Sequence, residues 1–265
     1  MRCLGVANKA DCEQLTPAAV RILKQSEDIT MKIMVLMNEY TPEALQLRKD
    51  AVAASTSQGV EIGYSVIEGS GGGKAVTDLH RAMVVPAAGR AAIAAEAAGY
   101  DAIVAWGTLD LGVEEGRHLV DIPIIGPGRV AANIAATLCQ RFAVIAYSTK
   151  QIVMFRKAMR GWGLEAWAVD YRHVDMPPLD IPGRAAEVRA TFVAEAKAAV
   201  RDHGAELILP LGYSIVPLTL RAADLSDDIG VPVIDPLPLT MRVAEALAAS
   251  GFRNSRVAYP RVVLT

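Results

Sequence analysis

Cysteine is scarce in this chain: among 265 residues there are only three, Cys3, Cys12 and Cys139. They are too few and too scattered to build a disulfide framework or a zinc knuckle. The four histidines are also spread out, with no pair at the spacing of metal ligands. We therefore expect a protein of the reducing cytoplasm that holds no metal.

Long apolar runs and an excess of one charge are absent too. No stretch reaches the roughly 18 apolar residues that a helix needs to cross a bilayer. Lys9, Asp11 and Glu13 stand where a signal peptide would need its apolar core, so export is not expected. A formal net charge of −2 gives neither a basic surface for nucleic acid nor a polybasic face for membranes. The expected partners are a small-molecule substrate and, in a homo-oligomer, further copies of the chain.

Nucleotide and hydrolase motifs are missing as well. The segment EGSGGGKAVT, residues 68–77, is similar to a P-loop, but Glu68 stands where the first glycine should be and Ala75 lacks the hydroxyl for magnesium. No GxGxxG pattern follows the first expected strand, and no GxSxG nucleophile elbow occurs. We expect residues 68–77 to form a flexible loop, and we expect no cofactor.

The chain does contain a regular alternation of short β-rich runs and longer helical runs, which is typical of repeated βα units. The expected strands are 32–37, 60–67, 101–106, 123–126, 142–147, 165–170, 206–211 and 232–235. The expected helices lie near 42–57, 83–99, 111–119, 128–140, 149–161, 183–203, 215–227 and 238–250. We predict an α/β fold with two pseudo-symmetric Rossmann-like halves, whose parallel sheets face a central cleft.

This pattern runs twice along the chain. GYDAIVAWG followed by VDIPIIGPG, in residues 99–128, is echoed by GAELILPLG followed by IGVPVIDPL, in residues 204–237. Each copy contains a strand, a glycine loop, a short helix and a second strand that begins near a proline. The expected division is a helical N-terminal extension over 1–30, a first half made of 31–128 plus 236–265, and a second half over 129–235.

Polar residues gather at the expected carboxyl ends of four strands, where ligands collect in sheets of this kind. WGTL and LGYS each place a glycine and a hydroxyl residue before a helix, where free amides and the helix dipole favour an anion. IAYSTK and LMNEYT offer further polar groups, and the four ends together contain Asn38, Glu39, Tyr40, Gly107, Thr108, Tyr147, Ser148, Thr149, Gly212, Tyr213 and Ser214. Because these ends are rich in hydroxyls and poor in fixed cations, they predict a pocket for a small carboxylate.

On these residues the chain resembles the aspartate/glutamate racemase superfamily, and most of all its hydantoin racemase and arylmalonate decarboxylase branches. MKIMVLMNEYT is similar to the family's first strand and substrate loop, and AAEAAGYDAIVAWGTLDLG to the segment with its first catalytic position. RFAVIAYST resembles the central strand, and GAELILPLGYS followed by IGVPVIDPL resembles the segment with the second position. The resemblance covers residues 31–258 and depends on the order and spacing of these motifs.

The resemblance implies where catalytic thiols would lie. In racemases of this family, two cysteines face each other across the cleft, and one removes the α-proton while the other returns it on the opposite face. The first position falls on Gly107 and the second on Tyr213, or on Gly212 if the loop shifts by one residue. Neither is a cysteine, so we expect a mechanism without the two thiols.

The decarboxylase branch implies a different use of the same cleft, in which hydroxyl and amide groups bind a carboxylate or an enediolate. The substrate-binding residues expected from it and from the strand ends are Asn38, Gly107, Thr108, Tyr147, Ser148, Gly212 and Ser214. A phenol with a pKa near 10 is a poor base at neutral pH but a serviceable acid, so we expect Tyr213 to act as the acid. Another group must then move the proton, and the candidates are Glu39, Asp110 and His118.

Together these features predict a cofactor-independent enzyme that acts on a small carboxylate or a cyclic ureide-like compound. The resemblance favours isomerase or decarboxylase chemistry at a carbon acid, in a cleft that stabilises an oxyanion or enolate. Two alternatives stay open. One is a hydrolase that opens a ring or cleaves a C–C bond with water activated by an acidic residue, and the other is a non-catalytic homologue that binds a small ligand.

Overall fold

The computed structural model describes residues 31–71 and 77–263 of the chain. The extension expected over residues 1–30 therefore lies outside the described residues, as do positions 72–76 of the expected glycine-rich loop. The helices of the described ranges are all too short or too polar to cross a membrane.

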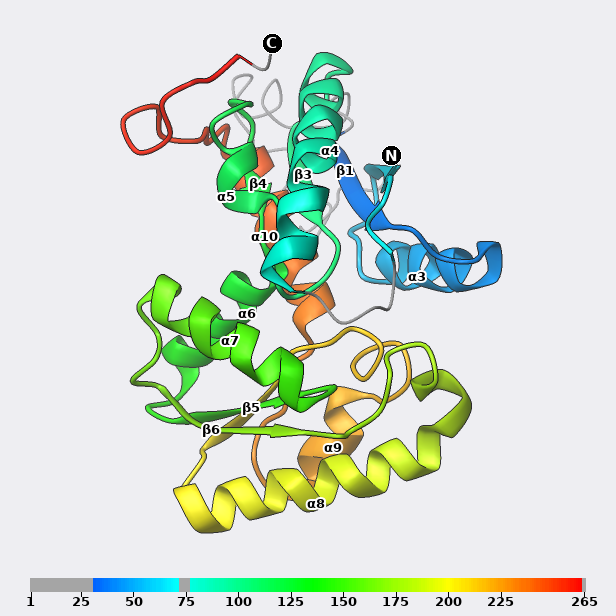
Figure 1. Ribbon diagram of the computed structural model, residues 1–265, viewed down its shortest axis with the longest axis vertical. Coiled ribbons are helices and arrows are strands. Elements are labelled where there is room, and N and C mark those ends of the chain that lie inside the picture. The colour runs from blue at the N-terminus through cyan, green and yellow to red at the C-terminus, as the bar shows by residue number, and fades with distance from the viewer. Residues whose placement is uncertain (1–30, 72–76, 264–265) are drawn as a thin grey trace, which may run out of the picture.

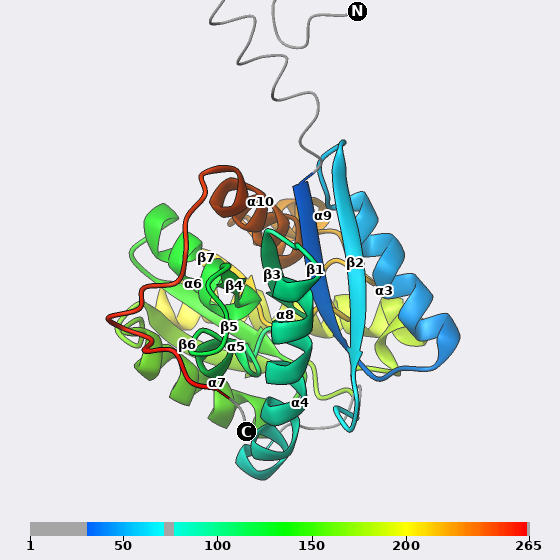
Figure 2. The ribbon, with the colours of Figure 1, turned by 90° about the horizontal axis from the view of Figure 1, so that it is seen from above.

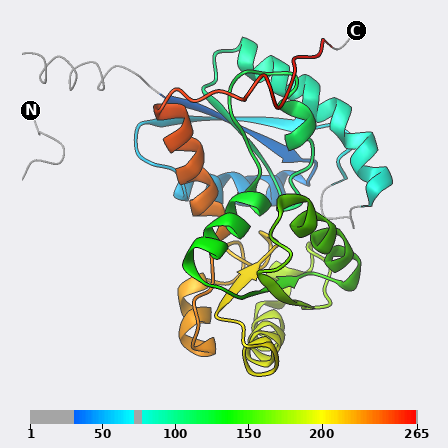
Figure 3. The ribbon, with the colours of Figure 1, turned by 90° about the vertical axis from the view of Figure 1, so that its left-hand side faces the viewer.

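Two parallel β-sheets organise the described residues. The first sheet contains β1 (Met31–Asn38), β2 (Val60–Ile67), β3 (Ala102–Ala105) and β4 (Ile124–Ile125), in the order β2-β1-β3-β4. The second contains β5 (Phe142–Ala146), β6 (Ala168–His173) and β7 (Leu207–Pro210), in the order β6-β5-β7. All neighbouring strands run parallel, and Figure 3 shows the two sheets one above the other. The predicted α/β class with parallel sheets is confirmed.

Helices connect the strands and cover the sheets. They are α3 (Pro42–Ala54), α4 (Asp78–Ala97), α5 (Val113–Gly116), α6 (Pro127–Leu138), α7 (Thr149–Trp162), the 3-10 turn η1 (Ile181–Arg184), α8 (Ala185–His203), α9 (Ala222–Ile229) and α10 (Pro236–Ala249). In Figure 2 the strands β1 and β2 lie between α3 on one side and α4 on the other. Helix α10 also packs against the first sheet, on β1 and β3.

Some elements differ from their predicted positions. Helix α4 begins at Asp78 rather than near residue 83, because the Thr77 hydroxyl accepts a hydrogen bond from the His80 amide and caps the helix. Strand β6 and helix α9 begin later than predicted. The strand expected at 232–235 is reduced to one bridge between Ile208 and Val233.

Alternate residues of each central strand face opposite layers of helices, as the two-residue period of a strand requires. In β5, Ala143 and Ile145 pack on the side of α8 and α9, whereas Phe142 and Val144 pack on the side of α6 and α7. Figure 1 shows these two helix layers below and above the second sheet. Because β5 is buried on both faces, it is apolar at every position, which is typical of a parallel sheet.

One close backbone approach joins α6 to the loop that follows β3. A Cβ atom added at Gly128, near the start of α6, would lie 2.0 Å from the carbonyl oxygen of Thr108. Glycine at this position therefore allows the helix to contact the loop directly. The contact fixes the loop that carries Gly107 and Thr108 against the second half of the chain.

We predict that Gly128→Ala destabilises the protein by about 1–3 kcal/mol, because the added methyl must displace backbone rather than a flexible side chain. The matched control is Gly161→Ala in the exposed part of α7, where a new Cβ meets nothing within 4 Å. That substitution should stabilise the protein by up to about 1 kcal/mol through helix propensity. Chemical denaturation of both variants checks the prediction, and equal effects of the two substitutions would contradict it.

Candidate functional site

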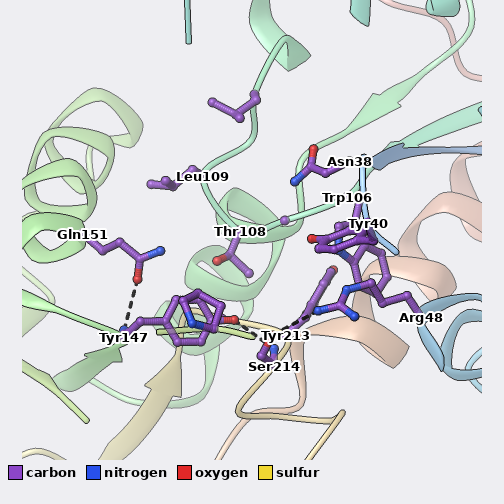
Figure 4. A pocket seen from close by; sticks show the side chains of 14 residues that line it. Asn38, Tyr40, Arg48, Trp106, Thr108, Leu109, Tyr147, Gln151, Tyr213 and Ser214 are labelled. Atoms are coloured by element: carbon purple, nitrogen blue, oxygen red, sulfur yellow. Dashed lines mark hydrogen bonds between the residues drawn. The ribbon is translucent and has the colours of Figure 1, made fainter. Parts of the chain in front are cut away.

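The loops at the carboxyl ends of β1, β3, β5 and β7 line a pocket of about 80 Å³ that is open on one side. The structure brings together eight of the strand-end residues predicted from the sequence: Asn38, Tyr40, Gly107, Thr108, Tyr147, Gly212, Tyr213 and Ser214. Apolar groups contributed by Trp106, Leu109, Leu111 and Pro178 complete much of the wall. The expected meeting of strand ends from both halves is therefore present (Figure 4).

Four predicted site residues lie outside the lining of this pocket: Glu39, Asp110, His118 and Ser148. Glu39 is exposed, and its carboxylate accepts a 3.5 Å hydrogen bond from the Gly71 amide. The Nδ1 atom of His118 lies 3.0 Å from the carbonyl oxygen of Pro260, in the carboxyl-terminal segment. Ser148 precedes α7 and lines a neighbouring hollow instead. Contacts with residues distant in sequence hold the side chains of Glu39 and His118 outside the pocket, although both lie near the predicted strand ends or loops.

Asp110 also lies outside this pocket, and its position indicates a structural task. It is buried, and its carboxylate accepts hydrogen bonds from the amides of Gly128 at 2.7 Å and Arg129 at 2.9 Å. These amides belong to the first turn of α6, so Asp110 caps that helix from the loop that carries Thr108. Burial raises the pKa of Asp110 to about 7, although the two amide hydrogen bonds act in the opposite direction.

The pocket contains a buried cation that was not predicted from the sequence. Arg48 of α3 is only 3% exposed and lines the pocket, so the prediction of a site poor in fixed cations was wrong. Helix α3 has two buried residues, Arg48 and Val52, and their spacing of four places both on one helical face. That spacing was a signal that Arg48 points inward, toward the sheet.

Arg48 is held in place without a negatively charged partner among the described residues. Its Nη1 donates to the carbonyl of Ala44 at 2.7 Å, and its Nη2 lies 3.4 Å from Ser214 Oγ. The guanidinium carbon lies 3.9 Å above the ring of Tyr40. Its buried Nε has no hydrogen-bond partner in the described part of the chain. A buried charge left unpaired is costly, and an anion bound in the pocket would relieve that cost.

An aromatic wall connects Gly107 and Tyr213 to Arg48. Tyr213 and Trp106 pack with ring centroids 4.6 Å apart, and Trp106 Nε1 donates to the Tyr40 hydroxyl at 3.2 Å. The Tyr40 ring in turn supports Arg48. Gly107, next to Trp106, has a φ of 101°, where a side chain would be strained. The Tyr213 hydroxyl is buried without a partner among the described residues, and burial raises its pKa.

Tyr147 presents a hydroxyl that can still donate. Its oxygen accepts a 2.8 Å hydrogen bond from the Ser214 amide, which leaves the phenol proton for another acceptor. The ring lies so close to Gly212 that a Cβ there would be 2.3 Å from the Tyr147 ring carbon Cζ. Burial raises the pKa of Tyr147 well above its ordinary value, so the group stays protonated at neutral pH.

The described residues offer no group of three or more His, Cys, Asp or Glu that could hold a metal ion. Cys139, the one cysteine in the described ranges, is the C-cap of α6, and its Sγ lies 3.2 Å from the carbonyl of Ala135. It does not line the pocket. Among the charged side chains, the lining of the pocket contains Arg48 and no carboxylate, a set that suits an anionic ligand.

Comparison with known proteins identifies the family. Residues 49–244 match the family model described as Asp/Glu/Hydantoin racemase. The chain belongs to this family. Its membership supports the expectation of an isomerase- or decarboxylase-type enzyme.

Relatives of this racemase-family chain include a hydantoin racemase from Rhizobium meliloti, 30% identical over 170 residues, which cover 63% of this chain and 69% of the relative. A hydantoin racemase from Paenarthrobacter aurescens is 30% identical over 151 residues, or 56% of this chain and 61% of the relative. The chain thus matches about two thirds of the length of these relatives.

Solved structures show the same fold. Allantoin racemase from Klebsiella pneumoniae superposes with a TM-score of 0.75 at 22% identity, covering 89% of this chain and 96% of the other. A variant of arylmalonate decarboxylase in a liganded form gives a TM-score of 0.59 at 16% identity, covering 87% and 97%. At these identities, the likeness establishes the two-domain α/β fold alone.

We predict that Arg48→Met does not destabilise the folded protein, because it removes a buried charge that has no counter-ion. The free energy of unfolding should stay the same or rise by about 1 kcal/mol. Arg117→Met is the control and should destabilise the protein, since Arg117 bonds to Glu114, Tyr259 and the carbonyl of Ile124. Thermal denaturation compares the two, and a large loss of stability in Arg48→Met would assign that side chain a structural role.

The raised pKa of Asp110 predicts a pH dependence of stability. In the unfolded state the pKa of the Asp110 carboxyl has its ordinary value of 3.8. Between about pH 4 and 7 the folded state therefore still binds a proton that the unfolded state has released. The stabilisation is therefore full below the unfolded pKa and is lost as the pH rises through about 7. Denaturant titrations of wild type and Asp110→Asn should show the wild type losing stability relative to the variant across this range. A difference that does not change with pH would contradict the prediction.

Proposed function

We propose that this chain is a cofactor-independent enzyme that binds a small carboxylate or cyclic ureide-like substrate and stabilises an enolate or related oxyanion, without the two-thiol mechanism. The observation that carries the proposal is the buried guanidinium of Arg48, which faces the pocket without a counter-ion among the described residues. Arginine binds carboxylates through charge-assisted hydrogen bonds, and the desolvated pocket strengthens them.

Tyr147 supplies the second part of the proposed chemistry. Its phenol is fixed by the Ser214 amide and has a proton to donate. Thr108, which is also buried, adds a hydroxyl to the same pocket. Donors fixed in advance around a developing oxyanion can each contribute on the order of 3–4 kcal/mol to transition-state stabilisation. The arrangement would thus stabilise most strongly a transition state in which an enolate oxygen develops negative charge near Arg48 and Tyr147.

The direction of proton movement follows from the same groups. A tyrosine whose pKa is raised by burial is an acid rather than a base at neutral pH. Tyr147 therefore serves best in a reaction that forms the enolate without proton abstraction and then protonates it. Loss of CO₂ from an activated carboxylate forms an enolate without a base. The enolate carbon then takes a proton from Tyr147, or from a water molecule that Tyr147 protonates, and the new C–H bond forms. Of the two kinds of family chemistry, decarboxylation suits these residues better than proton abstraction.

Hydrolysis is the weaker candidate. The groups suggested for activating water, Glu39, Asp110 and His118, do not line the pocket. Hydrolysis nonetheless gives a distinct product, so the same assay tests it.

The test is incubation of the protein in D₂O with a panel of α-amino acids, malonates, hydantoins and cyclic imides. Release of CO₂ with deuterium at the α-carbon would support decarboxylation, and deuterium without loss of carbon would support isomerisation. Ring-opened product would instead indicate a hydrolase, and binding without turnover would indicate a non-catalytic homologue. Either of the last two outcomes overturns the proposal.

We predict that Tyr147→Phe lowers kcat about 100-fold or more, because it removes a donor to the oxyanion. Tyr171→Phe is the matched control, because Tyr171 of β6 is a buried tyrosine that lies outside the pocket. Its hydroxyl has no hydrogen-bond partner in the described chain. Steady-state kinetics on the active substrate compare the two variants. Equal rates for Tyr147→Phe and wild type would remove Tyr147 from the mechanism.

A further inference from the structure

We propose that Gln151 determines the substrate class: the pocket accepts a monoanion with a carboxylate at one end and a neutral carbonyl oxygen, of an amide, imide or ureide, at the other. This inference rests on the proposed function, because it takes Arg48 as the carboxylate site. It adds a second fixed contact, at the opposite end of the same pocket.

The orientation of the Gln151 carboxamide is fixed by its neighbour. Gln151, in the first turn of α7, is 8% exposed and lines the pocket, and its Oε1 accepts a 3.1 Å hydrogen bond from the backbone amide of Tyr147. A backbone N–H can only donate, so the carboxamide must turn its oxygen toward it. The Nε2 group then points the other way, and Figure 4 shows it on the side of Thr108.

The Nε2 group forms no hydrogen bond to an acceptor in residues 31–71 and 77–263. An amide nitrogen has two N–H groups and no lone pair available, so it can only recognise an acceptor. A carbonyl oxygen of the ligand would provide one, and a donor group at the same place would leave both sides unsatisfied. The side chain therefore selects for a carbonyl rather than for an apolar end.

Gln151 and Arg48 stand at the two ends of a hydrogen-bonded chain along one wall. Arg48 contacts Ser214 Oγ at 3.4 Å, the Ser214 amide donates to the Tyr147 hydroxyl at 2.8 Å, and the Tyr147 amide donates to Gln151. The path between the two ends runs through Ser214 and along the Tyr147 side chain, from its hydroxyl to its backbone amide. A ligand that meets both must have two acceptors, one at each end.

The two ends differ in charge. Arg48 offers a full positive charge, whereas Gln151 offers a neutral amide. Lys150, the adjacent residue on the same helix, does not line this pocket, although it lines a neighbouring hollow that Gln151 also borders. A second carboxylate at the Gln151 end would be buried without a counter-charge from the lining, which is unfavourable. A half-amide or ureide should therefore bind better than the dicarboxylate of the same length.

Three probes of matched length test the inference by isothermal titration calorimetry: succinamate, succinate and butyrate. Wild type should bind succinamate about 10-fold more tightly than either of the others, since one additional buried hydrogen bond of about 1.4 kcal/mol is worth that factor. Gln151→Met should remove this preference. Gln151→Glu keeps an acceptor for the Tyr147 amide and loses the donor, so it should remove the preference even if Gln151→Met folds poorly.

The Arg48→Met variant separates the two levels of the proposal. It should weaken all three probes, because each has a carboxylate. If butyrate and succinamate bind with equal affinity and both depend on Arg48, the Gln151 inference fails while the carboxylate site stands. If no probe binds wild type, or if binding does not depend on Arg48, the proposed function fails as well. Persistence of the succinamate preference in Gln151→Glu would also overturn the assignment of Gln151.

Discussion

A guanidinium buried without a counter-ion among the described residues is the constraint on which the pocket depends. Removing a charge from water costs several kcal/mol unless hydrogen bonds and an opposite charge replace the hydration. The Arg48 guanidinium contacts the carbonyl of Ala44, the hydroxyl of Ser214 and the ring of Tyr40. These contacts replace only part of the hydration that the charge loses on burial. The remaining requirement is met most simply by an anionic ligand. We propose that the pocket is thereby prepared for a carboxylate before the ligand arrives, at a cost in the stability of the free protein.

The surrounding fold holds this charge in position from both halves. Trp106 follows β3 of the first sheet and Tyr213 follows β7 of the second, and their contact joins the two strand ends. Trp106 in turn fixes Tyr40, which supports the guanidinium. Glycine at 212 allows Tyr147 to approach closely. Gly107, with its positive φ, and the Tyr213 ring stand where the family resemblance implies thiols, and we propose that they position donors rather than move protons.

Much of the fold and part of the site could be predicted from the sequence. Parallel strands that are buried on both faces are apolar throughout, and their carboxyl ends meet at one edge, so Thr108, Tyr147 and Ser214 were correctly expected to lie together. Directions set by non-local contacts could not be predicted. His118 turns to the carboxyl-terminal segment, where it contacts Pro260, 142 residues away along the chain. Gln151 was missed although its contact is local and had a signal, since Ser148 and Gln151 stand at the spacing of a capping box at the start of α7. Arg48 was missed because charged helical residues usually face solvent.

The most direct test of the carboxylate site is a crystal structure of the protein soaked with butyrate, the simplest carboxylate of suitable length. We expect one carboxylate oxygen within hydrogen-bond distance of Arg48 Nη2, close to Ser214, with the guanidinium still stacked on Tyr40. A carboxylate bound away from Arg48, or an Arg48 side chain turned out to solvent, would contradict a pocket organised around this buried charge.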